Sequence, residues 1–163
     1  CFDMGVSADG IKDAVEKFTG AGRRFEFLGE YDGFMLADDY AHHPTEIKAT
    51  LSAAKELDYN NVIAVFQPFT FSRTALLKDD FIKALSIADK VILTPIMGSR
   101  EKNTYGIKSE DLAAGLHDVC VVDGFENIAD KIEEIARPGD LVITMGGGDI
   151  YKAAHIIQGR HAK

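Results

Sequence analysis

The stretch from residue 36 to residue 46 holds the densest group of side chains that could do chemistry. It reads Leu-Ala-Asp-Asp-Tyr-Ala-His-His-Pro-Thr-Glu, so Asp38 and Asp39 are adjacent. Paired carboxylates can hold a divalent metal or accept hydrogen bonds from a sugar diol. Capping of the next helix is the simpler explanation, but so many functional groups in one turn favour a site. Because side chains alternate along an extended segment, we expect one aspartate to face the ligand.

A second group follows the next apolar run, where residues 67–73 read Gln-Pro-Phe-Thr-Phe-Ser-Arg. Arg73 stands at a predicted helix start, where a cation opposes the helix dipole. A bound carboxylate or phosphate, gripped in bidentate fashion by the guanidinium, would offset this cost. A surface salt bridge is an equally good explanation at this stage. Arg23 and Arg24 open the first predicted strand and are similarly placed to reach an anion.

Several other features do not match known metal or nucleotide motifs. His42 and His43 lack the partners of a zinc site, and local hydrogen bonding at the helix start is expected for at least one of them. The glycines of residues 146–148 match neither a phosphate loop nor a dinucleotide fingerprint, which favours a tight turn. Cys1 and Cys120 form no disulfide framework, and Cys120 is expected to be a buried thiol in a strand.

Apolar runs that alternate with amphipathic segments predict an α/β fold. We expect a Rossmann-like, three-layer domain with a six-stranded, mainly parallel sheet and one antiparallel edge hairpin strand. Asp32-Gly33 is a hairpin signal between the first two strands. The predicted strands are 24–30, 34–38, 62–66, 90–94, 119–122 and 141–145, and the predicted helices are 45–57, 72–88, a short helix from Ser109, 127–136 and 150–158. Ligands of such sheets bind beyond the carboxyl ends of the strands, where both groups lie.

Composition limits the function classes. A chain of 163 residues that is 46% hydrophobic suits one globular domain, and its formal charge of −8 argues against a nucleic-acid partner. No apolar run approaches the roughly 20 residues of a membrane span, so we expect no membrane insertion and a cytoplasmic location. Because the chain opens with Cys1, we expect a fragment. Residues 1–19, with a short helix from Ser7 to Phe18, would be the tail of a preceding ATP-binding domain, and residues 20–163 the domain itself.

The two groups, taken with their surroundings, resemble a known family. The pattern is similar to the carboxy-terminal domain of the Mur ligases, and within them to the members that join L-alanine to UDP-N-acetylmuramate. The likeness runs from about Gly20 to Tyr151. The segments that carry it are 22–26, 38–46, 66–68, 72–74 and 140–146.

The resemblance implies a role in peptidoglycan synthesis. Its members have three domains, which bind the UDP-sugar, ATP and, in this domain, the incoming amino acid. ATP phosphorylates the muramate carboxylate, the amine of L-alanine attacks the acyl phosphate, and Mg²⁺, bound mainly by the central domain, clamps the phosphates. The ATPase loop of the central domain is absent from this sequence, so we expect the fragment to be inactive alone.

The resemblance also implies residue roles. The residues expected to surround L-alanine are Arg73, Gln67, Phe69, Thr70 and His42. Those expected to bind ATP are Asp39, Arg24 and Arg23, with no metal ligand in this domain. The family usually has histidine where this chain has Phe69, and a phenyl ring cannot hydrogen-bond the incoming amino acid.

Two other functions remain open. The ligase that recycles a whole tripeptide onto UDP-N-acetylmuramate has a similar pattern, although Glu46 follows the alanine-adding one. A non-enzymatic receiver module that accepts phosphate is also α/β with paired acids at a strand end. It would need a further aspartate after the central strand, where this chain has Gln67-Pro68, and a lysine after a late strand, where it has Gly146-Gly147.

Overall fold

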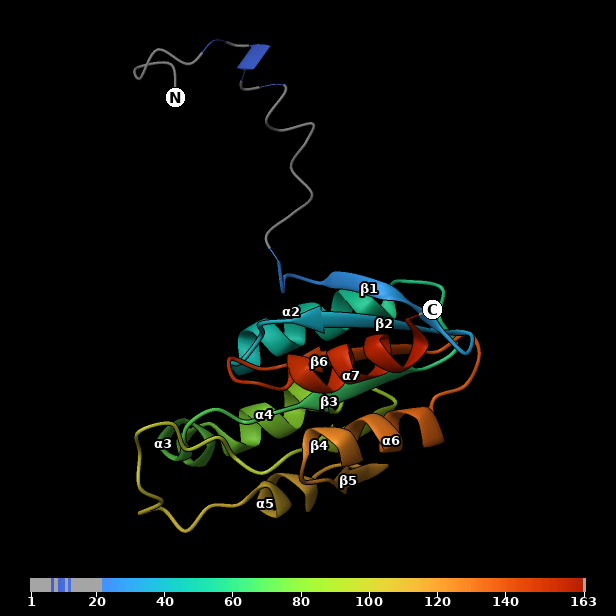
Figure 1. Ribbon diagram of the computed structural model, residues 1–163. Helices are drawn as coiled ribbons and strands as arrows, with labels where there is room; N and C mark the ends of the chain where they lie inside the picture. Colours follow the sequence, from blue (N-terminus) through green and yellow to red (C-terminus); the bar gives the residue numbers. More distant parts are fainter. Residues whose placement is uncertain (1–6, 8, 11, 13–21, 163) are drawn as a thin grey trace.

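The computed structural model describes residues 7, 9, 10, 12 and 22–162 (Figure 1). Within these residues the chain forms a six-stranded sheet with the strand order β1-β2-β6-β3-β4-β5. Only the β1–β2 pair is antiparallel, and the other four pairs are parallel. The predicted α/β class and strand count are therefore confirmed. The strands are β1 Glu26–Tyr31, β2 Phe34–Asp39, β3 Val62–Phe66, β4 Lys90–Leu93, β5 Val119–Val121 and β6 Leu141–Met145.

The hairpin that begins the sheet has the predicted turn. Asp32 and Gly33 both have positive φ, 48° and 87°. Two consecutive positive φ angles match the twist of the flanking strands, which is why aspartate and glycine are favoured here. The hairpin places β1 at one edge of the sheet and β2 beside the central strand β6.

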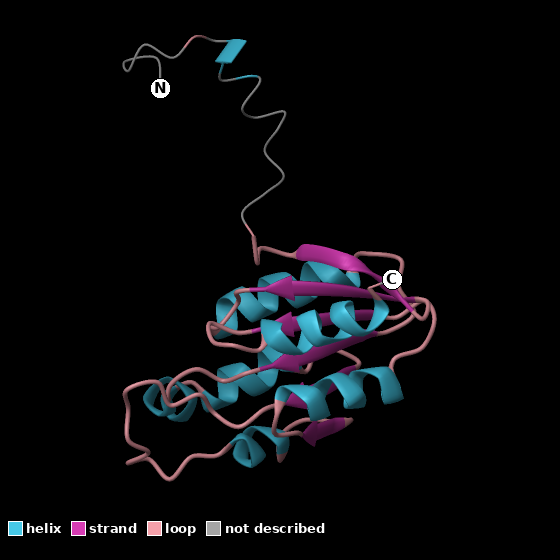
Figure 2. Ribbon diagram, in the orientation of Figure 1, coloured by secondary structure: helices cyan, strands magenta, loops and turns pink. Residues whose placement is uncertain are grey.

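Helices cover both faces of the sheet, as Figures 1 and 2 show. The side chains of α2, α4 and α5 pack with one set of strand residues, and those of α6 and α7 pack with the other set. All five residues of β3 and of β6 are buried, as expected for strands covered on both faces. The helices are α2 Pro44–Lys55, α3 Phe71–Leu76, α4 Lys78–Leu85, α5 Ser109–Ala113, α6 Phe125–Ile135 and α7 Tyr151–His161.

The start of α2 is fixed by local hydrogen bonds. Pro44 occupies the first helical turn, and His43 Nδ1 accepts a hydrogen bond from the N–H of Thr45 at 3.3 Å. Glu46 Oε2 accepts hydrogen bonds from the N–H groups of His42 and His43 at 3.0 and 3.1 Å. These contacts form a capping box, so the local role expected for one of the two histidines is confirmed.

Glu46→Ala should lower the free energy of unfolding by about 1 kcal/mol, because two backbone donors at the start of α2 lose their acceptor. Burial alone would raise the pKa of Glu46, but the hydrogen bonds from His42 and His43 and the charge of His42 outweigh it and lower the pKa. The stabilisation is thus present above the unfolded-state pKa and is lost as the pH falls through the lower folded-state value. In urea unfolding, the difference from wild type should shrink below about pH 4.

Glu56→Ala is the matched control for this prediction. Glu56 is exposed and lies at the other end of α2, where a carboxylate is not favoured by the helix dipole. Its removal should change the unfolding free energy by less than about 0.5 kcal/mol. Equal losses in the two variants would show that the capping box contributes nothing specific.

One helix prediction was wrong. The single helix expected over residues 72–88 is two helices, α3 and α4, separated at Leu77, which has φ −112° and ψ 23°. After the break, Phe81 and Leu85 are buried in the core, whereas Leu76 at the end of α3 is 74% exposed. No proline or glycine marks this break, so tertiary packing decides it.

Two smaller predictions concern the starts of short helices at Ser109 and Ser7. Of the residues 109–111 expected to cap the short helix, Asp111 does so by accepting from the N–H of Lys108 at 2.8 Å, whereas the hydroxyl of Ser109 donates to the carbonyl of Thr94 at 2.5 Å. For the helix predicted from Ser7, a hydrogen bond joins the N–H of Gly10 to Ser7 Oγ at 3.1 Å. Residues 8, 11 and 13–18 of that predicted helix, and Cys1, lie outside the described residues.

Candidate functional site

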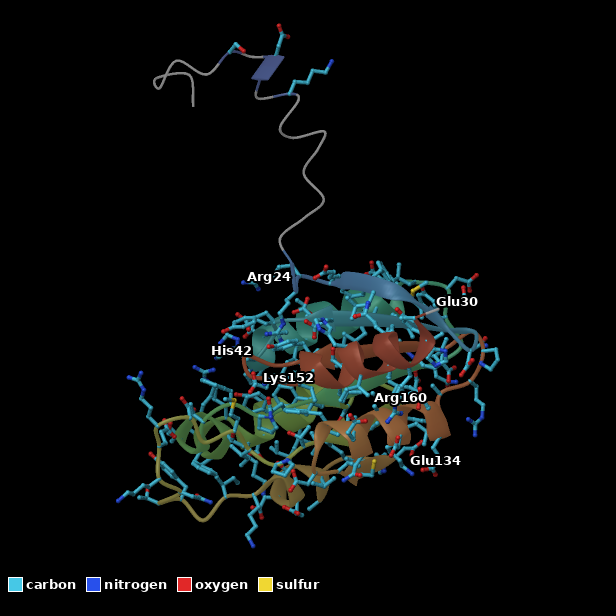
Figure 3. The ribbon with its side chains drawn as sticks, viewed as in Figure 1. Arg24, Glu30, His42, Glu134, Lys152 and Arg160 are labelled. Atoms are coloured by element: carbon cyan, nitrogen blue, oxygen red, sulfur yellow. The ribbon has the colours of Figure 1, made fainter. Side chains whose placement is uncertain are left out.

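The carboxyl ends of β2, β6 and β3 lie next to one another and bring the two predicted groups together. Asp39 pairs with Met145, and Met145 pairs with Phe66 on its other side. The side chains of Arg24 and His42 extend from this end of the sheet in Figure 3, whereas Arg160 and Glu134 lie at the opposite end. The site is therefore built on the central strands.

Asp38 forms an internal ion pair with Arg23. Its Oδ1 accepts a hydrogen bond from Thr144 Oγ1 at 2.6 Å, and its Oδ2 accepts one from Arg23 Nε at 2.7 Å. Burial raises the pKa of Asp38 above its ordinary value, although the hydrogen bonds from Thr144 and Arg23 oppose the rise. Loss of Arg23 would leave a buried carboxylate without a compensating positive charge.

Asp39 faces the backbone on the other side of β2. Its Oδ2 accepts from the N–H of Phe25 at 2.8 Å, and its Oδ1 accepts from the N–H of Ala41 at 2.7 Å. The two aspartates thus have separate partners, as alternation predicts. Each carboxylate oxygen has two lone pairs, so Asp39 keeps acceptor capacity for a ligand hydroxyl. Asp39 is nevertheless only 7% exposed.

The two adjacent arginines have different surroundings. Arg23 is half-buried, and beside its ion pair with Asp38 it donates to the carbonyls of Gly146 and Gly148 at 2.8 and 3.3 Å. Arg24 is exposed, and its guanidinium carbon lies 5.8 Å from the ring centre of Tyr40. Arg24 therefore remains available for an external anion.

The triple glycine forms the tight turn expected of it and contacts predicted site residues. Gly146 has φ +154°. A Cβ at Gly147 would lie 3.3 Å from the imidazole of His42. Gln67 is 8% exposed, and its Oε1 accepts from the N–H of Asp149 at 2.9 Å. The turn thus approaches both His42 and Gln67 closely because it carries no side chains.

Gly146→Ala should lower the free energy of unfolding by about 1–3 kcal/mol, because its positive φ strains any residue with a Cβ. The added methyl would also lie 3.1 Å from the carbonyl oxygen of Gln67, which as backbone cannot move aside easily. Urea unfolding measures the effect.

The matched control is Gly159→Ala in α7. Gly159 is exposed, and a Cβ there would meet nothing within 4 Å. In the last turn of a helix, alanine should still stabilise, by up to about 0.5–1 kcal/mol. Stabilisation of both variants would contradict the strain assigned to Gly146.

Arg73 has the least satisfied side chain of the site. Among the described residues, its Nη1 is the buried side-chain nitrogen or oxygen that lacks a hydrogen-bond partner. A buried guanidinium nitrogen left unpaired costs stability, and a bound anion would satisfy it. Arg73 lies in α3 just after Thr70, which has φ +67° and ψ 140°. Such a backbone conformation is strained for threonine and is often found at ligand sites.

The loop after β4 completes this side of the site, and sequence reasoning missed it. Phe69 forms an isolated parallel bridge with Met97. Glu101 accepts from the hydroxyl and the N–H of Ser72 at 2.6 and 2.9 Å, and these hydrogen bonds lower its pKa. No sequence motif marks Glu101 as functional. It lies in a polar loop, residues 95–105, and glutamates are common in such loops.

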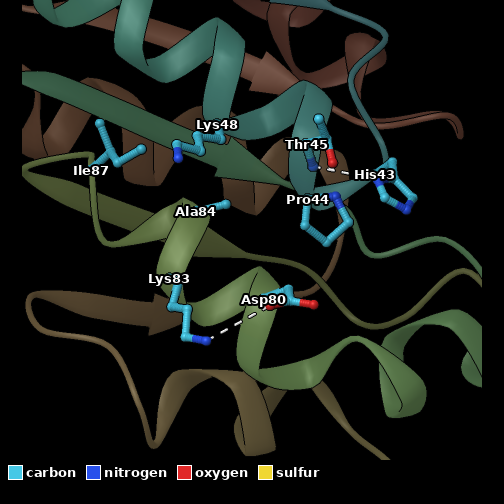
Figure 4. A pocket seen from close by; sticks show the side chains of 8 residues that line it. All are labelled: His43, Pro44, Thr45, Lys48, Asp80, Lys83, Ala84 and Ile87. Carbon is cyan, nitrogen blue, oxygen red and sulfur yellow. Dashed lines mark hydrogen bonds and ion pairs between the residues drawn. The ribbon is translucent and has the colours of Figure 1, made fainter.

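Two cavities border these elements. One of about 260 Å³ at the ends of β3 and β4 is lined by residues that include Gln67, Met97 and Asp123. An open groove of about 580 Å³ runs between α2 and α4, where Lys83 and Asp80 lie 3.8 Å apart (Figure 4). The groove contains none of the predicted site residues, so it is separate from the candidate site.

Comparison with known proteins identifies the family. Residues 23–148 match the family described as "Mur ligase, glutamate ligase domain". The chain belongs to the Mur ligases. It is 48% identical over 160 residues to UDP-N-acetylmuramate–L-alanine ligase of Caldicellulosiruptor saccharolyticus, covering 96% of this chain and 35% of that protein.

Solved Mur ligase structures share the fold. The structure of UDP-N-acetylmuramate-alanine ligase from Thermotoga maritima matches 98% of this chain and 34% of that chain, with 25% identity and a TM-score of 0.71. A murein peptide ligase from Psychrobacter arcticus matches 97% of this chain and 34% of that chain, with 23% identity and a TM-score of 0.72. The second likeness shows the fold alone. This Mur ligase chain thus spans about a third of the length of these relatives.

The described residues have neither a cluster of metal ligands nor a membrane-spanning helix. In the part of the chain that the structure describes, no three His, Cys, Asp or Glu side chains gather as metal ligands would. None of the described helices is long and apolar enough to cross a membrane. Cys120, on β5, is half-buried rather than buried as predicted, and burial raises the pKa of its free thiol, which disfavours the reactive thiolate.

Proposed function

We propose that this Mur ligase domain is the carboxy-terminal part, residues 20–163, of an ATP-dependent enzyme that adds L-alanine to UDP-N-acetylmuramate in peptidoglycan synthesis. The observation that carries the proposal is the 48% identity to a ligase of that name across 96% of the chain. Residues 1–19 would belong to the preceding ATP-binding domain. The proposed partners are that domain and the domain that holds the UDP-sugar, and the cytoplasm is the proposed compartment.

The proposed reaction has two steps. A carboxylate oxygen of the muramate attacks the γ-phosphorus of ATP, giving an acyl phosphate and ADP. The amine of L-alanine then attacks the acyl carbon, loses a proton and expels inorganic phosphate as the amide forms. Mg²⁺ would supply charge neutralisation at the phosphates, and this domain offers it no complete ligand set among its described residues.

Arg73 is proposed to bind the carboxylate of L-alanine. Its unpaired Nη1 supports this role, because L-alanine has little apolar area and depends on its charges for affinity. Thr70 and Phe69 precede it at the same turn, and Gln67 and His42 line the adjoining glycine turn. Phe69 would pack near the methyl group of the substrate without a hydrogen bond to it.

Arg24 and Asp39 are proposed to contact ATP when the domains close. The exposed guanidinium of Arg24 is free to reach a phosphate, and Asp39 has unused lone pairs for the ribose hydroxyls. Neither residue forms a nucleotide site alone. We therefore expect the 163-residue chain to bind ATP very weakly and to catalyse no ligation.

The experiment that tests the proposed function is a competition between L-alanine and a tripeptide as acceptor substrates. The full-length protein is given ATP, Mg²⁺, UDP-N-acetylmuramate and equal concentrations of L-alanine and the tripeptide used by murein peptide ligases. We expect UDP-N-acetylmuramoyl-L-alanine as the main product. Preference for the tripeptide would assign the protein to the recycling ligases, and phosphorylation of the protein by acetyl phosphate without ligation would support a receiver module instead.

A further inference from the structure

The side chain of Arg23 joins segments that are distant in the sequence. Its Nε donates to Asp38 at 2.7 Å, at the end of β2. Its two terminal nitrogens donate to the carbonyls of Gly146 and Gly148, which are 123 and 125 residues further along the chain. A planar guanidinium can hold three acceptors in fixed directions, which a lysine cannot do.

Aromatic rings and backbone bonds hold Arg23 further. The guanidinium carbon lies 5.1 Å from the ring centre of Tyr40 and 4.7 Å from that of Tyr151. The carbonyl of Arg23 accepts from the N–H of Tyr40 at 2.8 Å, and its own N–H donates to Glu26 at 2.7 Å. Both the backbone and the side chain of Arg23 are therefore fixed where the chain enters the sheet.

These contacts bear on the expected role of Arg23 as a ligand of ATP. If its guanidinium moved out to an external phosphate, Asp38, which is 2% exposed, would remain buried without its cation. Breaking such a pair is costly. Arg24 is exposed, and within residues 22–162 no hydrogen bond or ion pair holds its guanidinium as those of Arg23 do. Of the two arginines, only Arg24 can therefore move to an external anion at low cost.

We infer that Arg23 is a positioning residue that locks the point where the chain enters the domain and so places Arg24 and Asp39 for ATP. Arg24 lies between two residues whose N–H groups are anchored, Arg23 to Glu26 and Phe25 to Asp39. Its direction therefore depends on the bonds of Arg23. The effect on ATP rests on the function proposed above, whereas the lock itself does not.

A double-mutant cycle in the full-length enzyme tests the inference. Arg23→Lys and Asp38→Asn each break the same lock, so each should lower kcat/KM for ATP by about tenfold, and the double variant should be no worse than the poorer single variant. If Arg23 bound phosphate directly, Arg23→Lys would raise KM for ATP and Asp38→Asn would not. Any losses of kcat/KM in the two single variants would then multiply in the double variant. That result would overturn the inference.

Arg160→Lys is the matched control for loss of stability. Arg160 is also tied by three carboxylates, Glu126, Asp130 and Glu133, at 2.8, 2.8 and 2.6 Å, but at the opposite end of the sheet (Figure 3). Its replacement should lower the melting temperature and leave kcat/KM for ATP within about twofold. A tenfold loss in Arg160→Lys would mean that destabilisation alone explains the kinetic effect of Arg23→Lys.

Amide hydrogen exchange tests the lock without any activity. Arg23→Lys and Asp38→Asn should both speed exchange in peptides that span residues 22–26 and 146–149, whereas Arg160→Lys should not. Unchanged exchange in both segments would overturn the inference. A wild-type enzyme without ligase activity would refute the proposed function, and these exchange rates would still decide the role of Arg23.

Discussion

Arg73→Lys should raise the Michaelis constant of the full-length enzyme for L-alanine at least about tenfold and leave that for ATP nearly unchanged. Lysine keeps the charge but cannot reproduce the fork that holds a carboxylate in bidentate fashion. Arg73→Ala should do the same more severely, with a loss of about 2 kcal/mol or more in transition-state stabilisation. Steady-state kinetics with each substrate varied in turn measure both effects.

Arg100→Lys is the control for this prediction. Arg100 is an exposed arginine on the neighbouring loop, and its replacement should change neither constant more than about twofold. If Arg73→Lys weakened ATP alone, Arg73 would be a phosphate ligand. The unpaired Nη1 would then belong to the nucleotide site and the proposed amino-acid pocket would be wrong.

Asp39→Asn should have the opposite preference and raise the Michaelis constant for ATP about tenfold, more than that for L-alanine. In the wild-type protein the N–H groups of Phe25 and Ala41 both donate to the Asp39 carboxylate. The asparagine amide would place an NH₂ group against one of these two donors. We therefore expect a loss of about 1–3 kcal/mol in unfolding free energy. Kinetics and urea unfolding of the same variant separate the two effects.

Asp58→Asn provides the comparison for Asp39→Asn. Asp58 is exposed and lies between α2 and β3, at the opposite edge of the sheet from Asp39. Its replacement should alter stability by less than about 0.5 kcal/mol and leave both constants unchanged. A larger effect on L-alanine than on ATP in Asp39→Asn would remove Asp39 from the nucleotide site.

The parts of the fold that sequence predicted well depend on short-range signals. Asp32-Gly33 predicts the hairpin because only certain residues accept two positive φ angles. Residues 62–66 form a buried strand because an unbroken apolar run fits the middle of a parallel sheet. The break at Leu77 has no such signal, since it follows from how Phe81 packs against Phe66 at 5.5 Å between ring centres.

The candidate site shows a similar limit. The positions of Asp38, Asp39 and Gln67 follow from the rule that parallel strands end at one edge. The partners of Arg23 could not be inferred, because Gly146 and Gly148 are more than a hundred residues away and contribute only backbone carbonyls. Likewise, the hydrogen bonds of Glu101 to Ser72 depend on the path of an irregular loop.

The proposed activity of the full-length protein is activation of a muramate carboxylate for attack by L-alanine. It is tested most directly with UDP-N-acetylmuramate whose carboxylate carries heavy oxygen. The full-length protein with ATP and L-alanine should release inorganic phosphate that contains one labelled oxygen for each amide formed. Unlabelled phosphate, or labelled phosphate that forms with the tripeptide but not with L-alanine, would contradict the account.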